Sequence, residues 1–248
     1  MRGRLVTRLA VTALVLVAVV PAAQAGGEAM QSRLEHAMHV YYYGDREEAL
    51  KLLRPLAEAD CAKAQSKLSN IYSIKAEEGG NPQRVVRWTR RAAENGNAEA
   101  QFSMGAMYVY GMDGLGPRDY DNALKWYRRA AEQGEPIAMR EVSWMYFQGH
   151  GVERDPVEGY KWLLLAIPRY PPSTKEPAHG VGFDNTERAG ATAYRDGLRQ
   201  HLTTLVITLA KGRAKAWEKA HDYIHRMPET SDKPLPLWYD RIKGGCDD

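Results

Sequence analysis

Two histidines and a glutamate near the C-terminal end have a spacing that can bind a metal ion. His221 and His225 are four residues apart, and Glu218 precedes His221 by three residues. On a helix all three side chains project toward one side, where two imidazoles and a carboxylate can bind zinc. However, no further ligand is visible, and no general-base glutamate lies inside the histidine pair. We interpret the group as a solvated polar face, with metal sequestration as the alternative.

The sequence has no combination of residues that is typical of a hydrolase or of a phosphate-binding loop. It contains no G-x-S-x-G motif and no S-x-x-K motif with its partners, and neither cysteine has a histidine close by in the sequence. The glycines of "GMDGLG" and "GHG" lack the lysine and the strand-then-helix setting of a phosphate-binding loop. We therefore predict that the protein is not an enzyme and needs no cofactor.

The chain has two cysteines, Cys61 and Cys246, which are far apart in the sequence. In an oxidising compartment they can form a disulfide. Closing so long a loop stabilises a fold by about 5 kcal/mol in the chain-entropy description. Pairing requires the C-terminal tail to fold back to the front of the molecule. The alternative is two unpaired or intermolecular thiols.

Residues 1–25 resemble an export signal. Arginines precede an apolar run from Leu9 to Val20, and Ala23 to Ala25 form an A-x-A cleavage site. The run is too short to span a bilayer comfortably, because spanning takes roughly 20 apolar residues. Because Gly26 and not a cysteine follows the site, we expect a soluble periplasmic or secreted protein rather than a lipid-anchored one. An uncleaved signal would instead remain as an N-terminal membrane anchor.

The charges of the remaining chain are nearly balanced. The formal net charge of +3 is accounted for by the arginines of the expected signal, which contains no acid. Elsewhere basic and acidic residues are interspersed and form no basic block of the kind that binds nucleic acid or an anionic membrane. We therefore predict a protein or peptide partner, no nucleic acid, and no membrane insertion after signal cleavage.

One stretch of the chain occurs almost twice. "WTRRAAENG" spans residues 88–96 and "WYRRAAEQG" spans residues 126–134. Further positions repeat at shifts of 36 and then 38 residues: Ala64, Leu68, Ser69 and Tyr72; Ala100, Met104, Gly105 and Tyr108; Ala138, Val142, Ser143 and Tyr146. Similarity at such a period predicts a solenoid of stacked units.

Each unit is predicted to contain two helices, because apolar residues recur at helical spacing in both halves. Gly111 and Gly149 are placed to end a first helix, and Asp119 and Asp155 to cap a second one. The middle of the first helix holds a small residue in every unit, which lets the paired helices approach closely. These small residues are Ser69, Gly105 and Ser143.

This pattern resembles the Sel-1-like repeat, a branch of the tetratricopeptide-like helical superfamily. The resemblance implies an all-α fold: an α/α superhelical solenoid with C-terminal capping helices. We expect the array at residues 26–170, with units at about 30–60, 62–96, 98–134 and 136–170. Some exported members carry a cysteine pair in each repeat, which this chain lacks.

Three segments follow the array. Residues 171–186 are rich in proline and glycine and are predicted to be a linker, and residues 228–248 an irregular tail. Residues 187–227 are predicted to form capping helices that close the open end of the stack. On the last of these we expect Leu209, Ala216, Trp217 and Ala220 to share the packed side.

The first helices of a stacked array line its concave face, where we predict the partner-binding groove. Along it, polar residues in the second unit give way to aromatic residues and arginine, which are frequent anchors of protein interfaces. The predicted binding residues are Phe102, Tyr110, Arg140, Trp144, Phe147 and Gln148. The alternative is that Trp144 and Phe147 pack on the neighbouring unit or on the closing helices.

The resemblance implies a non-enzymatic scaffold, and exported bacterial members of the family are associated with regulation of membrane sensors, envelope assembly and polysaccharide export. The alternative is an envelope enzyme acting on cell-wall material or a β-lactam, a role attributed to some cysteine-rich relatives. The absence of their cysteine pattern and of serine and lysine motifs favours the scaffold.

Overall fold

The computed structural model describes residues 22–77, 81–112, 114–170, 185–221 and 246. These residues form α-helices, one short 3-10 helix and connections, without a strand among them, which confirms the predicted all-α solenoid. The helices are α1 (Ala22–Tyr43), α2 (Arg46–Glu58), α3 (Ala62–Glu77), α4 (Pro82–Glu94), α5 (Ala98–Tyr110), α6 (Tyr120–Glu132), α7 (Pro136–Gln148), α8 (Pro156–Ala166), η1 (Ile167–Arg169), α9 (Asn185–His201) and α10 (Thr204–Ala220). None of the described helices is both long and apolar enough to span a membrane.

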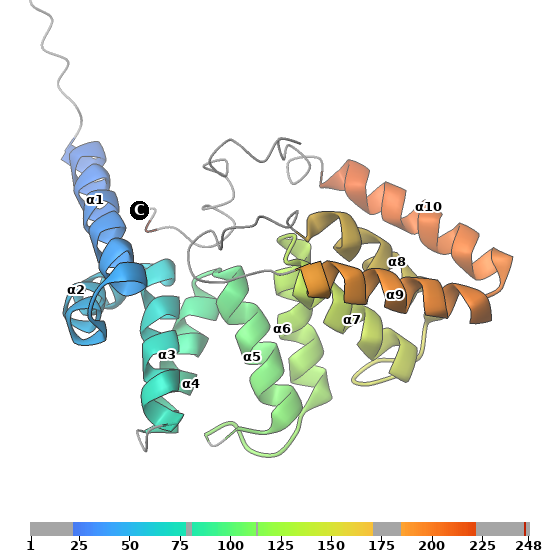
Figure 1. Ribbon diagram of the computed structural model, residues 1–248, viewed down its shortest axis with the longest axis horizontal. Helices are drawn as coiled ribbons and strands as arrows, with labels where there is room; N and C mark the ends of the chain where they lie inside the picture. Colours follow the sequence, from blue (N-terminus) through green and yellow to red (C-terminus); the bar gives the residue numbers. More distant parts are fainter. Residues whose placement is uncertain (1–21, 78–80, 113, 171–184, 222–245, 247–248) are drawn as a thin grey trace, which may run out of the picture.

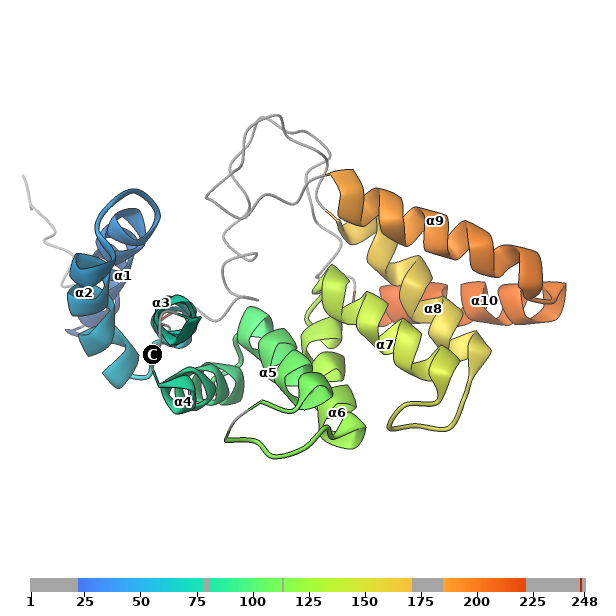
Figure 2. The same ribbon diagram turned by 60° about the horizontal axis from the view of Figure 1, so that its bottom comes forward.

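Each helix from α1 to α8 packs against the next one in the chain, and α10 packs against α8. The helices follow one another along the long axis of the molecule (Figure 1). Seen from the side, they form an arc in which α3 and α5 lie on the inner side and α4 and α6 on the outer side (Figure 2). The side chains of α3, α5 and α7 that point away from their paired helices are called the inner face below.

In two of the inner helices, the small residue is matched to the residue that it faces. A Cβ atom on Gly105 would lie 2.5 Å from the ring of Tyr127 on α6. In the unit before, the hydroxyl groups of Ser69 and Thr89 are hydrogen-bonded to each other. A large side chain therefore faces glycine, and a smaller one faces serine, which keeps the helix pairs closely packed.

Buried glutamines link neighbouring units. The Nε2 atoms of Gln65 and Gln101 donate to carbonyl oxygens in the last turns of α2 and α4, at 2.9 and 3.0 Å. Their side-chain oxygens accept hydrogen bonds from Asn95 at 3.0 Å and from Gln133 at 2.7 Å. Each glutamine thus joins the ends of two successive outer helices. Met139 occupies the matching position of the next unit.

The predicted helix ends are confirmed. Gly111 and Gly149 end α5 and α7 in the left-handed conformation, with φ of 71° and 74°. The Asp119 carboxylate accepts a hydrogen bond from the backbone N–H of residue 122 at 3.0 Å. The Asp155 carboxylate accepts from the N–H groups of residues 157 and 158 at 2.9 and 3.0 Å. These groups satisfy donors that a helix start leaves unpaired.

The packed side of α10 differs from the predicted one. Leu209, Ala216 and Ala220 are exposed, and the buried residues are Ala210 and Ala214. Trp217 packs against Trp162 of α8, with the ring centroids 5.9 Å apart. Ala210, Ala214 and Trp217 form one helical stripe at i, i+4 and i+7. The small alanines let α10 lie close to α8, whereas Leu209 would hold the helices apart.

Candidate functional site

The inner face changes in character along the array. On α3 it presents Ser66, Lys67 and Asn70, and on α7 the matching positions are Arg140, Glu141 and Trp144. Phe102, Ser103 and Ala106 of α5 lie between them. The face therefore has a charged, hydrogen-bonded end near α3 and a more aromatic end near α7.

At the α3 end, three side chains bind one carboxylate of α5. The Nζ atom of Lys67 lies 2.8 Å from Oε2 of Glu99. The Nδ2 atom of Asn70 donates to Oε1 of Glu99 at 3.3 Å, and the Ser66 hydroxyl lies 3.4 Å from Oε2. Lys67 is buried and also lies 5.7 Å from the centre of the Tyr41 ring. This cluster joins two neighbouring units across the inner face.

The Lys67 ammonium stays charged in this setting. Burial acts to lower the pKa of Lys67, but the attraction of the Glu99 carboxylate acts in the opposite direction, and the pKa is raised overall. A catalytic lysine needs a lowered pKa to become a nucleophile or a base near neutral pH. Lys67 is therefore a partner in a salt bridge and not a reactive amine.

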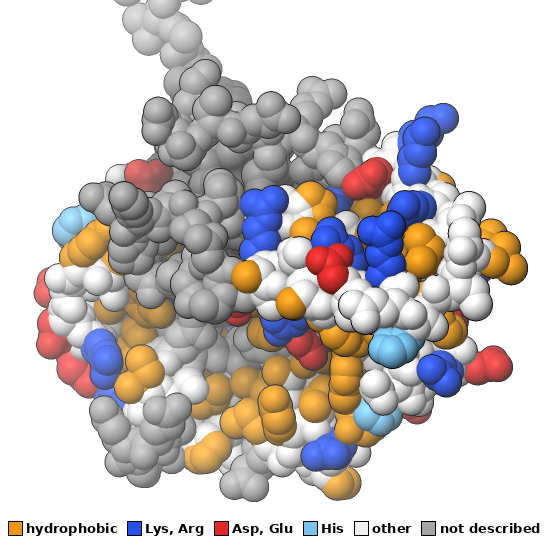
Figure 3. All heavy atoms as spheres, turned by 45° about the vertical axis from the view of Figure 1, so that its right-hand side comes forward, with side chains coloured by type: hydrophobic (Ala, Val, Ile, Leu, Met, Phe, Trp, Pro, Cys, Tyr) orange, Lys and Arg blue, Asp and Glu red, His pale blue; other side chains and the backbone are white. Residues whose placement is uncertain are grey.

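From α5 to α7, aromatic side chains of the inner face are partly or fully accessible. Tyr110 is 76% exposed at the end of α5, and Phe102 is half-buried with its ring 5.6 Å from that of Tyr127. Trp144 is half-buried, with its ring edge-on to the His150 imidazole at 4.7 Å. Figure 3 shows hydrophobic side chains gathered on the lower part of the face that is turned forward in that view.

Phe147 does not belong to this accessible group. It is 7% exposed, and its ring lies 6.4 Å from the Tyr194 ring of α9. A Cβ atom on Gly159 of α8 would lie 3.0 Å from the same ring. Phe147 is thus core between α7, α8 and α9, so the prediction that it binds a partner is wrong, and the alternative of packing on a closing helix applies.

The two polar residues of the predicted site differ in their surroundings. Gln148 is exposed at the end of α7. Arg140 is half-buried, and its Nη2 atom lies 3.0 Å from Oε1 of Glu141. Burial raises the pKa of the nearby Tyr170 to about 12, so that this tyrosine stays neutral. The charge of Arg140 is partly neutralised by Glu141, and the Arg140 side chain remains on the inner face.

The suggested metal ligands are not seen together. The imidazole of His221 stacks on the Trp217 ring at 4.0 Å, and its Nδ1 atom lies 2.9 Å from the Trp217 carbonyl oxygen. His225 lies outside the described residues. Among the residues that the structure does describe, no group of three potential ligands could hold a metal ion.

Cys61 and Cys246 are joined by a disulfide, with their Cα atoms 4.3 Å apart. Both are buried, and both pack in the apolar cluster formed by α1, α2 and α3. The bond therefore ties the C-terminal end of the chain to the start of α3.

Lys67 and Glu99 are absent from the predicted site. One signal could have found them, because each occupies an inner position on successive first helices and their charges are opposite. The repeat alignment places Ser103 and Ile137 at the corresponding positions one unit later, so the pair exists at only one junction of the described array.

Three consecutive stretches of the chain, residues 62–97, 98–135 and 136–167, match the Sel1 repeat. The chain is a Sel1 repeat protein. The matched stretches contain the pairs α3–α4, α5–α6 and α7–α8, and α1 and α2 precede them. Sel1 repeats mediate protein–protein interactions, and protein partners are accordingly expected.

Relatives of this Sel1 repeat protein differ widely in size. Chitin synthase regulatory factor 3 of Schizosaccharomyces pombe is 31% identical over 163 residues, which cover 61% of this chain and 17% of that protein. A protective antigen of uropathogenic Escherichia coli strains, which displays an SLR fold, is 24% identical with a TM-score of 0.59, covering 86% of this chain and 43% of that one. A Sel1 repeat protein from Oxalobacter formigenes is 34% identical with a TM-score of 0.44, covering 48% of this chain and 89% of that one. The chain thus spans less than half the length of the first two.

Proposed function

We propose that this Sel1 repeat protein is an exported, non-enzymatic scaffold that binds a partner protein or peptide on its inner face. The observation that carries the proposal is the exposed Tyr110, with the half-buried Phe102 and Trp144 on the same face. Tyrosine, tryptophan and arginine contribute much of the energy of protein interfaces when they become buried there. Arg140 lies on the same face and can bind an acidic or amide group of the partner.

The charged groups of the inner face fit binding better than catalysis. Lys67 is paired with Glu99, and Arg140 with Glu141. Burial raises the pKa of Tyr127, which therefore stays protonated like Tyr170. Such groups can position a partner, but none of them is activated as a general acid or base near neutral pH.

Export is supported by two features. Residues 1–25 have the pattern of a cleavable signal, although residues 1–21 lie outside the described part of the chain. The disulfide between Cys61 and Cys246 is typical of proteins in an oxidising compartment. A periplasmic or secreted scaffold could regulate an envelope sensor or an assembly or export complex. The name of the fission-yeast relative, a regulatory factor, is compatible with regulation.

The test is site-specific photocrosslinking in cells. A crosslinking side chain is placed at position 110 or 144 on the inner face, and at position 205 as the control. Leu205 is 67% exposed but lies on α10, away from the inner face. We expect positions 110 and 144 to capture the same envelope protein and position 205 not to capture it.

The captured protein is then purified and its affinity is measured. Tyr110→Ala is expected to weaken binding by about tenfold or more, because truncating an interface anchor costs over 1 kcal/mol. Leu205→Ala should leave the affinity unchanged. Equal capture from all three positions would refute the inner face as the site. A small-molecule product released during incubation with envelope material would support the enzyme alternative instead.

A further inference from the structure

Helix α4 concentrates positive charge on the outer side of the array. Four arginines lie between residues 84 and 91, and the helix has one acid, Glu94. The matching helix α2 has three basic and three acidic residues, and α6 has three basic and two acidic ones. Basic and acidic residues are interspersed over the sequence as a whole, but α4 has a strongly basic surface.

Most of these arginines have no acidic partner. Arg91 is neutralised, since its Nη2 atom lies 2.8 Å from Oδ1 of Asp60. Arg84 and Arg87 instead lie over aromatic rings, at 5.8 Å from the Tyr72 centroid and 6.0 Å from the Trp88 centroid. Neither they nor Arg90 form an ion pair with any residue that the structure describes. Their charges are available to a ligand, and the ring contacts restrict the motion of two side chains.

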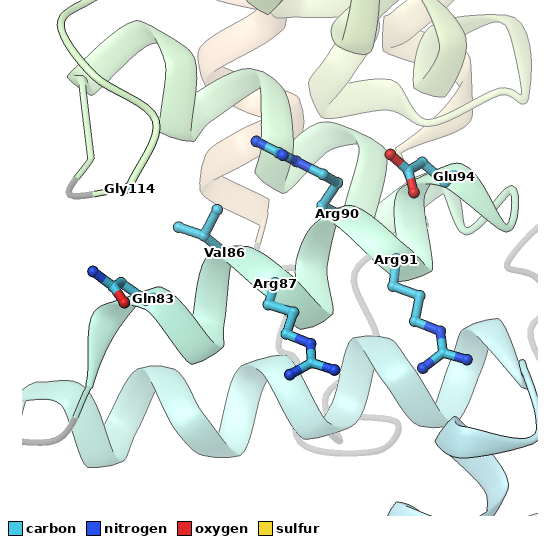
Figure 4. Close-up of a pocket in the computed structure, with 7 residues that line it drawn as sticks. All are labelled: Gln83, Val86, Arg87, Arg90, Arg91, Glu94 and Gly114. Carbon is cyan, nitrogen blue, oxygen red and sulfur yellow. The ribbon is translucent and has the colours of Figure 1, made fainter.

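A depression of about 660 Å³ lies beside these residues. It is bounded by α4 on one side and by the α5–α6 connection at Gly114 on the other. Figure 4 shows Arg87 and Arg91 extending to one side of α4 and Arg90 to the other, with Val86 pointing toward Gly114. A ligand in the depression can therefore meet guanidinium groups on both sides of the helix.

We propose that this depression binds an acidic segment of a partner protein, whose carboxylates are bound by Arg87 and Arg90. A guanidinium group donates two parallel hydrogen bonds to a carboxylate, which adds direction to the charge attraction. The site lies on an outer helix and shares no residue with the inner face, so the scaffold can hold two partners at once.

The surroundings favour a short acidic segment over an extended polyanion. Glu58 is exposed near one end of α4, and Glu94 lines the depression itself. These carboxylates would repel a long nucleic acid or a flat anionic membrane that extends past the arginines. A peptide with a few acidic residues can bind between them.

The probe is a short fluorescein-labelled peptide rich in glutamate, compared with the same peptide carrying glutamines. Binding to the full chain is measured by fluorescence anisotropy at low ionic strength. We expect the glutamate peptide to bind and the glutamine peptide not to bind. The combined Arg87→Glu and Arg90→Glu change should weaken binding by about tenfold or more, because two ion pairs are replaced by repulsion.

The matched control is the combined Arg199→Glu and Arg188→Glu change, which reverses the charge of two exposed side chains on α9. It changes the net charge by the same amount and should alter the affinity less than about twofold. Arg87→Gln with Arg90→Gln serves as a milder variant, and circular dichroism verifies that all variants fold. Tyr110→Ala should leave peptide binding unchanged, which separates this site from the inner face.

Three results would overturn the proposal. The first is no binding of the glutamate peptide, and the second is an equal loss in the α9 control. The third is that duplex DNA or phosphatidylglycerol vesicles bind more tightly than the peptide, and that this tighter binding depends on Arg87 and Arg90.

Discussion

At the scale of single residues, the spacing of a helix pair depends on the fit between one small and one large side chain. Gly105 faces Tyr127, whereas Ser69 faces Thr89 in the unit before. Tyr127 and Thr89 each directly follow the repeated tryptophan. Between these two units, the size of this residue changes together with the size of the small residue that it covers. Exchanging one of them without the other should disturb the packing.

We predict that Gly105→Ser destabilises the protein, although serine occupies the same position in two other units. Its Cβ atom would lie 2.5 Å from the Tyr127 ring, which is itself 3% exposed and has little room to move. Overpacking of this kind costs about 1–3 kcal/mol. The free energy of unfolding, measured with urea, should fall by about 2 kcal/mol.

The compensating change is Tyr127→Leu, which copies Leu163 in the following unit. In the Gly105→Ser background it should recover part of the loss, so the two changes should be non-additive in a double-mutant cycle. Gly212→Ala on α10 is the control, since its Cβ atom would meet nothing within 4 Å. It should stabilise the helix by about 0.5–1 kcal/mol. Additive effects of Gly105→Ser and Tyr127→Leu would contradict the proposed fit.

At the scale of whole elements, aspartates start two of the outer helices. Backbone N–H groups donate to Asp119 and lower its pKa. Burial raises the pKa of Asp155, but hydrogen bonds from the backbone N–H of Glu158 and from Arg213 outweigh it, and the pKa is lowered overall. Arg213 belongs to α10, so this cap also helps to hold α10 on α8.

These shifts predict a loss of stability in acid. A carboxyl whose pKa is lower in the folded state stabilises the protein above its unfolded pKa of about 3.9, and this stabilisation is lost as the pH falls through the folded pKa. The combined Asp119→Asn and Asp155→Asn variant keeps capping side chains that do not titrate. It should be slightly less stable at neutral pH, and its stability should fall less steeply below about pH 5.

The measurement is urea unfolding at a series of acidic pH values. Asp196→Asn is the control, because Asp196 lies inside α9 and caps no helix. If the double variant and the wild type lose stability in parallel, the two caps do not account for the acid sensitivity.

At the scale of the whole molecule, the disulfide connects parts that the helix stack keeps apart. Cys61 lies at the start of α3, and Cys246 follows it by 185 residues. The last described helix, α10, packs on α8 at the other end of the array (Figure 1). The bond therefore restricts the unfolded chain over almost all of the repeats.

We predict that Cys246→Ser lowers the free energy of unfolding by up to about 5 kcal/mol, the chain-entropy value for so long a loop. A reducing agent should lower the stability of the wild type by a similar amount and should not affect the variant. Thermal and urea unfolding with and without the reductant measure both effects. A reductant effect of equal size on the wild type and the variant would show that the stabilisation does not come from this bond.

Much of the fold follows from local sequence. The helix pairs, the glycine ends at Gly111 and Gly149 and the caps at Asp119 and Asp155 depend on residues that are close in sequence. Such signals act within one or two helical turns, and the repeat shows each of them at least twice. The family resemblance follows for the same reason.

The sequence by itself therefore determined that this protein is a stack of helix pairs with a small residue at each close contact. Only the tertiary structure decided that Phe147 is core, that Ala210 and Ala214 rather than Leu209 pack on α8, and that Lys67 binds Glu99. The same holds for Arg87 and Arg90, which border one depression. The physical reason is that burial depends on what the next element covers, and no other pair among the described helices repeats the placement of α9 and α10.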